Sequence, residues 1–339
     1  MTAATPPSLS VAIIGLGVGE QHIAGFEAHP EAAVVALCDI DERRLAEVAA
    51  RHPGRALHTS DREILADPQI DVVSVASYDD AHHRQVVAAL EAGKHVFVEK
   101  PLCQTRAQAQ EIRRLLRSRP GLRLSSNLPL RASPRFRVLR ELVQSGELGD
   151  LYYLEGDYQY GRLHKITRGW RGQLAFYSVL QGGAVHMVDL LLWLSGEEVV
   201  DVVALGHQGP SRGTQFRYPD VVAALLRLTS GAIAKMTTNF AGAHPHFHDV
   251  RLFGSRATFV NAAPDALLHR WDGDDVVTTA IDAPYPGIRK GDLIPSFVEA
   301  IVADGTPDVD EEDVFRTMSV VFAIEDAVGS GDRVAVEPL

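Results

Sequence analysis

A charged pair followed by a proline, Glu99-Lys100-Pro101, comes directly after the apolar run Val96-Phe97-Val98. A run this short suits a strand that is covered on both faces of a sheet. Side chains just past the carboxyl end of such a strand lie at the edge where doubly wound sheets bind their ligands. Glu99 and Lys100 are therefore candidates to face a bound cofactor or substrate. On position alone, a surface ion pair that contributes little is an equal alternative.

A glycine-rich turn lies between the first predicted strand, residues 11–14, and a helical pattern that reaches Phe26. Glycines in this context allow backbone N–H groups and the helix start to meet a pyrophosphate. The spacing departs from the usual G-x-G-x-x-G, because Gly19 comes one residue early and Glu20 stands where the third glycine is expected. We still predict a dinucleotide site here, made by Gly15, Gly17, Val18 and Gly19.

The next predicted strand, residues 34–38, ends in Asp39, which lies 24 residues after Gly15 (39 − 15). A carboxylate at about this spacing binds the ribose hydroxyls of NAD and repels the 2′-phosphate of NADP. The sequence therefore favours NAD, although Arg43 and Arg44 leave NADP possible. The alternative is that Asp39 or Asp41 caps the helix predicted for residues 42–50.

Strands and helices alternate through the first 125 residues, which predicts a Rossmann-type parallel sheet. Ser77 and His82 follow the strand predicted for residues 71–76, so both could approach the cofactor. As a lone histidine, however, His82 is more often a helix-start or core residue. We expect residues 1–125 to form the dinucleotide-binding domain, with residues 1–9 as a loose tail, and residues 126–339 to form a second domain.

Composition excludes several classes of protein. The net charge is −11 and no basic cluster occurs, so a nucleic-acid partner is not expected. No apolar stretch approaches the roughly 20 residues that span a bilayer, and the first residues carry no signal-peptide pattern. The two cysteines, Cys38 and Cys103, suit free thiols in a reducing compartment. We therefore expect a cytoplasmic protein.

Several of these motifs together resemble the Gfo/Idh/MocA family of NAD(P)-dependent oxidoreductases, named after glucose-fructose oxidoreductase, inositol dehydrogenase and rhizopine catabolism. The resemblance rests on Gly15-x-Gly17 with His22, on Asp39, on the run 89–96 and on Glu99-Lys100-Pro101, and it extends over nearly the whole chain. It implies an N-terminal Rossmann domain and a C-terminal α/β domain. The latter carries a large, mostly antiparallel sheet that holds a sugar or cyclitol and often mediates oligomers, so we expect a homodimer or homotetramer.

The resemblance also implies catalytic roles for two residues. Lys100 would lie beside the nicotinamide and hydrogen-bond the reacting hydroxyl or carbonyl oxygen. His186 would be the general acid/base, since an imidazole can take or return a proton near neutral pH; the alternative is a buried helix-start histidine. The family usually has an aspartate four residues before this histidine, and this chain has Gly182. Tyr177 and Lys100 are other candidate proton donors; Asp189, three residues after His186, matches the family's structural aspartate.

Polar and aromatic residues in the second half could hold a polyol. We name as candidates Tyr160, Arg162, Lys165, Trp170, Tyr177, Asp189 and His246. The histidines at 244, 246 and 248 have a spacing that could bind zinc. The resemblance implies no metal there, and Pro245 disfavours a regular strand, so no metal is expected.

The sequence thus predicts an enzyme that transfers a hydride between NAD, or NADP, and a hydroxyl or keto carbon of a sugar, sugar derivative or cyclitol. Two other functions remain open. One is an NAD-using glycosidase of the same fold, which would release a sugar without net cofactor turnover. The other is a non-catalytic regulator that binds the dinucleotide and a sugar.

Overall fold

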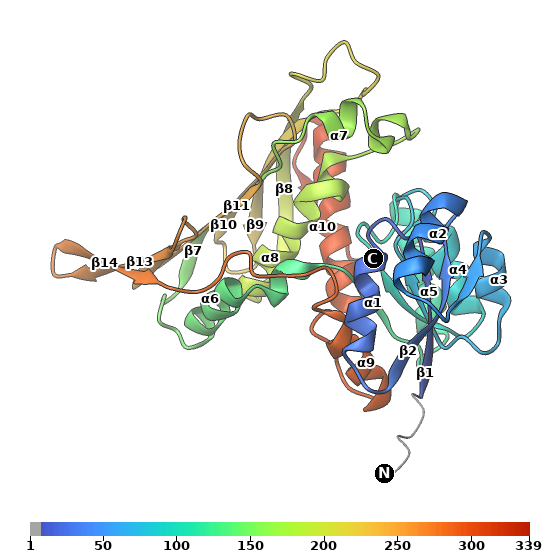
Figure 1. Ribbon diagram of the computed structural model, residues 1–339. Helices are drawn as coiled ribbons and strands as arrows, with labels where there is room; N and C mark the ends of the chain where they lie inside the picture. The colour runs from blue at the N-terminus through green and yellow to red at the C-terminus, as the bar shows by residue number, and fades with distance from the viewer. Residues whose placement is uncertain (1–7) are drawn as a thin grey trace, which may run out of the picture. The chain divides into compact units, whose positions relative to one another are not determined.

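The computed structural model describes residues 8–339, which form two compact units (Figure 1). The first contains residues 8–129 and Arg289–Phe315, and the second contains Leu130–Ile288 and Arg316–Pro338. The boundary predicted at residue 125 differs from this division, because residues 289–315 return to the first unit. In that segment helix α9 (Ile294–Val302) packs on helix α1 (Glu20–Glu27). A β-carbon on Gly25 would lie 2.6 Å from the carbonyl oxygen of Gly291. Of the predicted tail, residues 1–7 lie outside the described residues, and Leu9 already belongs to the first strand.

The first unit is built on a six-stranded parallel sheet in the order β3-β2-β1-β4-β5-β6. Its strands are β1 Leu9–Ile14, β2 Ala32–Cys38, β3 Ala56–His58, β4 Val72–Val75, β5 His95–Val98 and β6 Leu124–Ser126. This is the Rossmann order, in which the chain starts at the centre and leaves in both directions. The predicted fold of this unit is confirmed. The four residues of β4 are buried, as expected for a strand covered on both faces.

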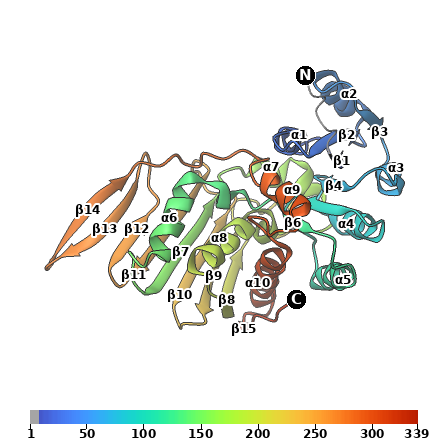
Figure 2. The same ribbon diagram turned by 90° about the horizontal axis from the view of Figure 1, so that it is seen from below.

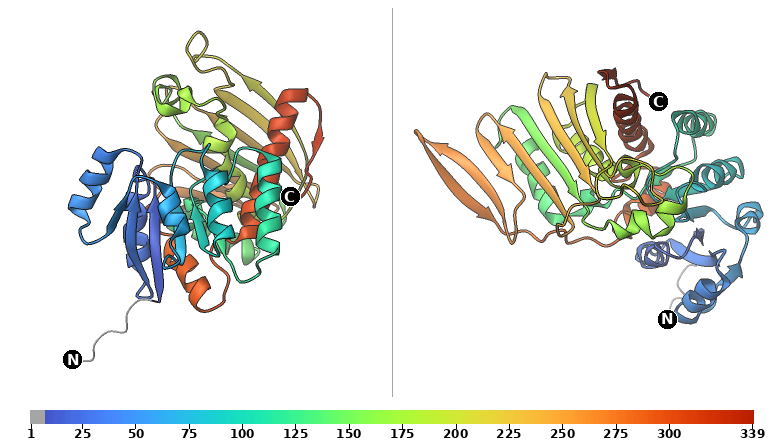
Figure 3. Two further views of the ribbon diagram at one scale, coloured as in Figure 1. Left: turned by 90° about the vertical axis from the view of Figure 1, so that its right-hand side faces the viewer. Right: turned by 90° about the horizontal axis from the view of Figure 1, so that it is seen from above.

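Helices cover this sheet on both sides. They are α1 Glu20–Glu27, α2 Glu42–Arg51, α3 Asp61–Ala66, α4 His82–Glu91, α5 Arg106–Arg117 and α9 Ile294–Val302. Helix α5 begins where its sequence requires, because Thr105 and Gln108 form a complete capping box. Figure 3 shows α1 to α5 in blue and teal and α9 in orange.

The second unit is built on a nine-stranded sheet in the order β14-β13-β12-β11-β7-β10-β9-β8-β15. Its strands are β7 Leu151–Gln159, β8 Val199–His207, β9 Val221–Leu228, β10 Ile233–Asn239, β11 Phe247–Gly254, β12 Ala257–Val260, β13 Ala266–Asp272, β14 Asp275–Ile281 and β15 Val334–Ala335. Neighbouring strands are antiparallel except β7 and β10, which run parallel. The predicted large, mostly antiparallel sheet is confirmed.

Buried and exposed positions alternate along the central strands, so one face of the sheet is covered. Figure 2 shows α6 (Pro134–Gln144), α8 (Val185–Ser195) and α10 (Glu311–Ser330) along that face. Shorter pieces are η1 Pro129–Ala132, α7 His164–Thr167, η2 Trp170–Gln173 and the π-helical turn η3 Leu180–Ala184. The turn η3 runs directly into α8, so residue 182 and His186 lie on one continuous helical segment.

Candidate active site

The glycine-rich turn between β1 and α1 combines close packing with an open side. Gly15 has a φ of +87°, and a β-carbon there would lie 2.5 Å from the carbonyl oxygen of Ala76. A β-carbon on Gly17 would meet nothing within 4 Å. Gly15 is therefore fixed by β4, whereas Gly17 presents bare backbone that a pyrophosphate can approach. Val18, which lies between Gly17 and Gly19 in the chain, is half-buried.

Asp39 holds the glycine turn at the carboxyl end of β2. Its carboxylate accepts hydrogen bonds from the N–H groups of Leu16, at 2.7 Å, and Asp41, at 2.9 Å. The N-cap of α2 is Asp41, which accepts from the backbone of Arg43 and Arg44. The capping alternative thus applies to Asp41, and Asp39 remains available at the position of a ribose-binding carboxylate.

The two arginines after Asp39 differ in their surroundings. Arg43 is exposed. The guanidinium of Arg44 donates to the carbonyl oxygen of Leu16, at 2.8 Å, and to Glu20, at 2.7 Å. Glu20 therefore has a structural use in the place of the third glycine, and Arg44 is committed to the turn.

Glu99 is the centre of a buried polar cluster at the carboxyl end of β5. Its Oε1 accepts a hydrogen bond from Asn127 Nδ2 at 2.6 Å and lies 3.3 Å from His22 Nε2. Burial alone would raise the pKa of this carboxyl, but the hydrogen bond from His22 and the nearby Lys290 and Lys100 charges hold the pKa well below its usual range. Glu99 is therefore an ionised carboxylate next to Lys100.

His82 and Ser77 lie between the ends of β4 and β5. His82 begins α4 and is buried, with Nδ1 2.7 Å from the carbonyl oxygen of Pro101 and Nε2 3.2 Å from that of Ser77. The Ser77 hydroxyl donates to Gln85 at 2.6 Å. His82 thus fixes the backbone on both sides of the sheet edge, and direct contact of either side chain with the cofactor stays a prediction.

These groups fit a dinucleotide in three respects. The glycine turn leaves bare backbone at Gly17, and Asp39 stands at the end of the second strand. Asn127 is fully buried near Lys100, and its Oδ1 has no hydrogen-bond partner among residues 8–339. A buried acceptor without a partner at this edge suits a hydrogen bond from a bound ligand.

In the second unit His186 lies in an aromatic cluster on the covered face of the sheet. Its ring stacks on Tyr158 with the centroids 6.0 Å apart. Tyr158 is directly paired across the strands with Thr238 and His248. The rings of His248 and His246 lie 5.4 Å and 5.2 Å from that of Tyr158. The first turn of α8 therefore packs against aromatic rings, and the imidazole nitrogens of the cluster lie among them.

The predicted substrate residues occupy different parts of this unit. Tyr160 is buried against Phe240, with ring centroids 4.5 Å apart, and the exposed His246 covers it from the solvent side. Arg162 is exposed and its guanidinium lies over the ring of Tyr160. Trp170 is half-buried beside Tyr177. Tyr160, Arg162 and His246 therefore lie together with the aromatic cluster, and their contact with substrate stays a prediction. Lys165 is exposed on α7.

Asp189 is a structural residue. Its carboxylate is buried and makes a bidentate ion pair with Arg131, with contacts of 2.6 Å and 3.1 Å. The Arg131 guanidinium also lies over the ring of Trp193. This burial agrees with the resemblance of Asp189 to the family's structural aspartate, and its contact with a substrate stays a prediction.

Tyr177 occupies the space that a side chain at position 182 would need. A β-carbon on Gly182 would lie 2.0 Å from the Tyr177 hydroxyl oxygen and 2.6 Å from its Cζ. Tyr177 is itself 2% exposed. The departure from the family pattern at Gly182 is thus tied to the tyrosine five residues earlier.

One residue of the second site, Tyr285, was not predicted from the sequence. Tyr285 contacts His248 through its hydroxyl, 2.6 Å from Nδ1 and 3.0 Å from the backbone nitrogen, and burial raises its pKa to about 12. Tyr158 and His248 face the cluster because of strand alternation, a signal that the sequence does contain. No local signal points to Tyr285, which lies 37 residues further along the chain.

Two kinds of feature are absent from the described part of the chain. Within residues 8–339 no three His, Cys, Asp or Glu side chains gather as metal ligands would, and the histidines at 244–248 form no such group. No helix of that part of the chain is long and apolar enough to cross a bilayer.

Comparison with known proteins places these features in a family. Residues 9–127 match the oxidoreductase family with an NAD-binding Rossmann fold, and residues 136–260 match the GFO/IDH/MocA C-terminal domain. An uncharacterized oxidoreductase of Synechocystis is 30% identical over 56% of this chain and 52% of its own length. Myo-inositol 2-dehydrogenase of Thermotoga maritima is 26% identical over 73% of both chains. The structure of a levoglucosan dehydrogenase in complex with NADH, 20% identical, superposes with a TM-score of 0.86 over 98% of this chain and all of that one. The chain belongs to the Gfo/Idh/MocA oxidoreductase family.

Proposed function

We propose that this protein transfers a hydride between NAD and a hydroxyl-bearing or keto carbon of a sugar or cyclitol. The observation that carries the proposal is the end of β5, where the ionised Glu99, tied to His22 and Asn127, holds the backbone of Lys100 at the ligand-binding edge of a Rossmann sheet. The relatives of this chain include an inositol dehydrogenase and, by fold, a levoglucosan dehydrogenase, and both names support a sugar or cyclitol as the substrate.

When bound at this edge, NAD would supply the hydride acceptor for oxidation of the substrate carbon, and NADH the hydride donor for reduction. Lys100 donates a hydrogen bond to the reacting oxygen and favours the charge that develops there. His186 takes the hydroxyl proton during oxidation and returns it during reduction.

The walls around His186 support a polyol. Tyr158 and Tyr160 offer apolar faces, and His246 and His248 offer nitrogens that can hydrogen-bond hydroxyl groups. Arg162 over Tyr160 adds a cation at the exposed side. We propose that these residues, with Trp170 and Tyr177 beside them, select the substrate.

We also propose NAD over NADP. Asp39 would place a carboxylate against a 2′-phosphate, and Arg44, the arginine nearest the turn, is already paired with Glu20. The exposed Arg43 is the remaining cation that could favour NADP.

The test is nicotinamide absorbance of the purified protein with NAD and NADP separately, against inositols, levoglucosan and their oxidised forms. We expect turnover with NAD that Lys100→Met and His186→Asn both abolish. The exposed Arg117→Met, at the end of α5 and outside both sites, is the control and should keep the activity. Tight NAD binding without turnover on any of these substrates, or equal activity in Lys100→Met, would contradict the proposal. Release of a sugar from glycosides without net NADH would point to the glycosidase.

We further propose an oligomer that covers the open face of the nine-stranded sheet. Apolar side chains are exposed there, with Leu205 at 78%, Leu225 at 47% and Ile233 at 46%. Leu225→Glu should convert the oligomer to a monomer in light scattering. The two buried free cysteines, Cys38 and Cys103, support a cytoplasmic location.

A further inference from the structure

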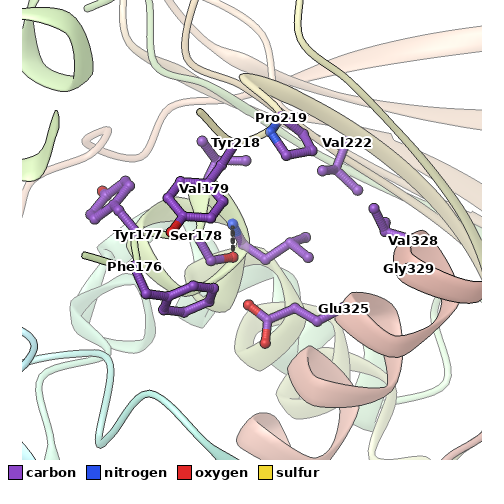
Figure 4. Close-up of a pocket in the computed structure, with 11 residues that line it drawn as sticks. Phe176, Tyr177, Ser178, Val179, Tyr218, Pro219, Val222, Glu325, Val328 and Gly329 are labelled. Carbon is purple, nitrogen blue, oxygen red and sulfur yellow. Dashed lines mark hydrogen bonds between the residues drawn. The ribbon is translucent and has the colours of Figure 1, made fainter. Parts of the chain in front are cut away.

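A cavity lies within the second unit, and His186 is not among the residues that line it. It is bounded by residues 176–180, by the start of β9 and by the last turns of α10 (Figure 4). Its volume is about 200 Å³. Most of the wall is apolar, from Phe176, Tyr177, Tyr218, Val222 and Val328. An apolar cavity of about 150 Å³ is enough to hold benzene, so this one can hold a small organic molecule.

One charged group faces this cavity. Glu325 lies on α10, and Figure 4 shows its carboxyl directed toward the pocket. Its Oε2 accepts a hydrogen bond from Gln181 Nε2 at 3.1 Å. Its Oε1 is buried and has no hydrogen-bond partner within the described part of the chain. A buried oxygen without a hydrogen-bond partner costs free energy. A ligand in the cavity that donates a hydrogen bond to this oxygen would therefore be stabilised.

The residues that line the cavity indicate the chemical class of that hydrogen-bond donor. An ionised carboxylate only accepts hydrogen bonds, so its partner must donate. The aromatic rings attract cations: Phe176 and Tyr218 meet edge to face with their centroids 5.4 Å apart, and Tyr177 closes a third side. A carboxylate beside aromatic walls is the arrangement that recognises an ammonium group on an apolar body.

We propose that this cavity binds a small organic cation. A primary ammonium group would donate to Oε1 of Glu325, and an apolar body of about six to nine heavy atoms would lie against Phe176, Tyr177 and Tyr218. No covalent step is involved. The cavity shares Tyr177 with the residues proposed to select the substrate, but it uses neither Lys100 nor His186, so binding in it can be measured without turnover.

The surroundings of Glu325 make binding depend on pH. Burial raises the pKa of this carboxyl to about 7, although the nearby Ser178 and Gln181 side chains lower it, and Asp326 on the same helix raises it further. The hydroxyls of Tyr177 and Tyr218 are the other titratable groups that line the cavity. An ammonium ligand favours the ionised carboxylate, so its binding should release a proton when the pH lies below 7.

The experiment is calorimetric titration of the full chain, without substrate, with benzylamine, and with benzyl alcohol as the neutral molecule of the same shape. We expect benzylamine to bind, Glu325→Gln to weaken it at least tenfold, and Asp326→Asn and Lys100→Met to leave its affinity within twofold. Equal affinity of the two molecules, or no effect of Glu325→Gln, would overturn the proposal.

A second measurement keeps the test valid if Glu325→Gln does not fold. Titration of the unaltered protein in two buffers of different ionisation enthalpy counts the protons released with each benzylamine bound. We expect close to one proton at pH 6 and close to none at pH 8. The absence of proton release at both pH values, or of any benzylamine binding, would overturn the proposal.

Discussion

Substitution of Gly182 by alanine should destabilise the second unit, although alanine is the better helix former. The new methyl carbon would lie 2.0 Å from the Tyr177 hydroxyl oxygen, against an ordinary contact of at least 3.4 Å, so one of them must move by about 1.4 Å. Tyr177 cannot easily retreat, because the rings of Trp170, Phe216 and Phe240 lie 6.2–6.4 Å from its own.

The size of the effect follows from two opposing terms. Overpacking a filled site costs about 1–3 kcal/mol. Replacing glycine by alanine inside a helix returns up to about 1 kcal/mol. We therefore expect Gly182→Ala to lower the free energy of unfolding by about 1–2 kcal/mol. In Tyr177→Ala the same methyl group enters a cavity instead, and its cost should vanish or change sign.

The assay is urea unfolding of the parent, both single variants and the double variant. Tryptophan fluorescence reports on the second unit alone, because Trp170, Trp193 and Trp271 all belong to it. We expect a coupling of about 1–3 kcal/mol between the two substitutions. Gly329→Ala is the matched control, since a β-carbon there meets nothing within 4 Å and α10 should gain stability. Additivity of Gly182→Ala and Tyr177→Ala within about 0.5 kcal/mol would refute the steric explanation.

Three further outcomes are expected. The pKa of Glu99 in the folded protein lies below its ordinary value of 4.5, so the ionised carboxylate stabilises the fold above that pH and this stabilisation is lost as the pH falls. Glu99→Gln should therefore make the free energy of unfolding depend less steeply on pH at the acid end. An unchanged slope in the variant would refute this. Asp189→Asn should cost about 3–5 kcal/mol in urea unfolding, by leaving Arg131 buried without its counter-charge, and joint replacement of Arg131 by Met and Asp189 by Leu should recover most of it. Asp39→Ser should raise KM for NAD about 10- to 100-fold, the equivalent of losing a charge-assisted hydrogen bond, and an unchanged KM would remove Asp39 from the ribose site.

The first unit could be predicted because its decisive signals are local. The capping box of α5 needs only Thr105 and Gln108, and β5 is marked by three apolar residues between a glycine and an ion pair. The glycine turn is recognised from the strand before it and the helix after it. Such elements depend on neighbours within a few residues, which a single sequence displays.

The features that escaped prediction depend on distant partners. Nothing near residues 289–315 indicates that they return to the first unit, because the decisive contact is the close approach of Gly291 to Gly25. From its sequence position Asp189 is a candidate to bind a ligand, but in the fold it pairs with Arg131, which lies 58 residues away in the chain. Periodicity shows that a side chain is buried, but it does not show which charge or ring meets it there.

The glycine at 182 shows how these two kinds of information combine. From sequence alone it is the loss of a carboxylate near His186. In the structure the phenol of Tyr177 fills the volume in which any side chain at 182 would begin, so the two groups exclude each other. A phenol can donate a hydrogen bond, whereas an ionised carboxylate can only accept one. The position has therefore exchanged an acceptor for a donor, and a protein of this fold that keeps the aspartate must place its residue 177 equivalent elsewhere or make it smaller.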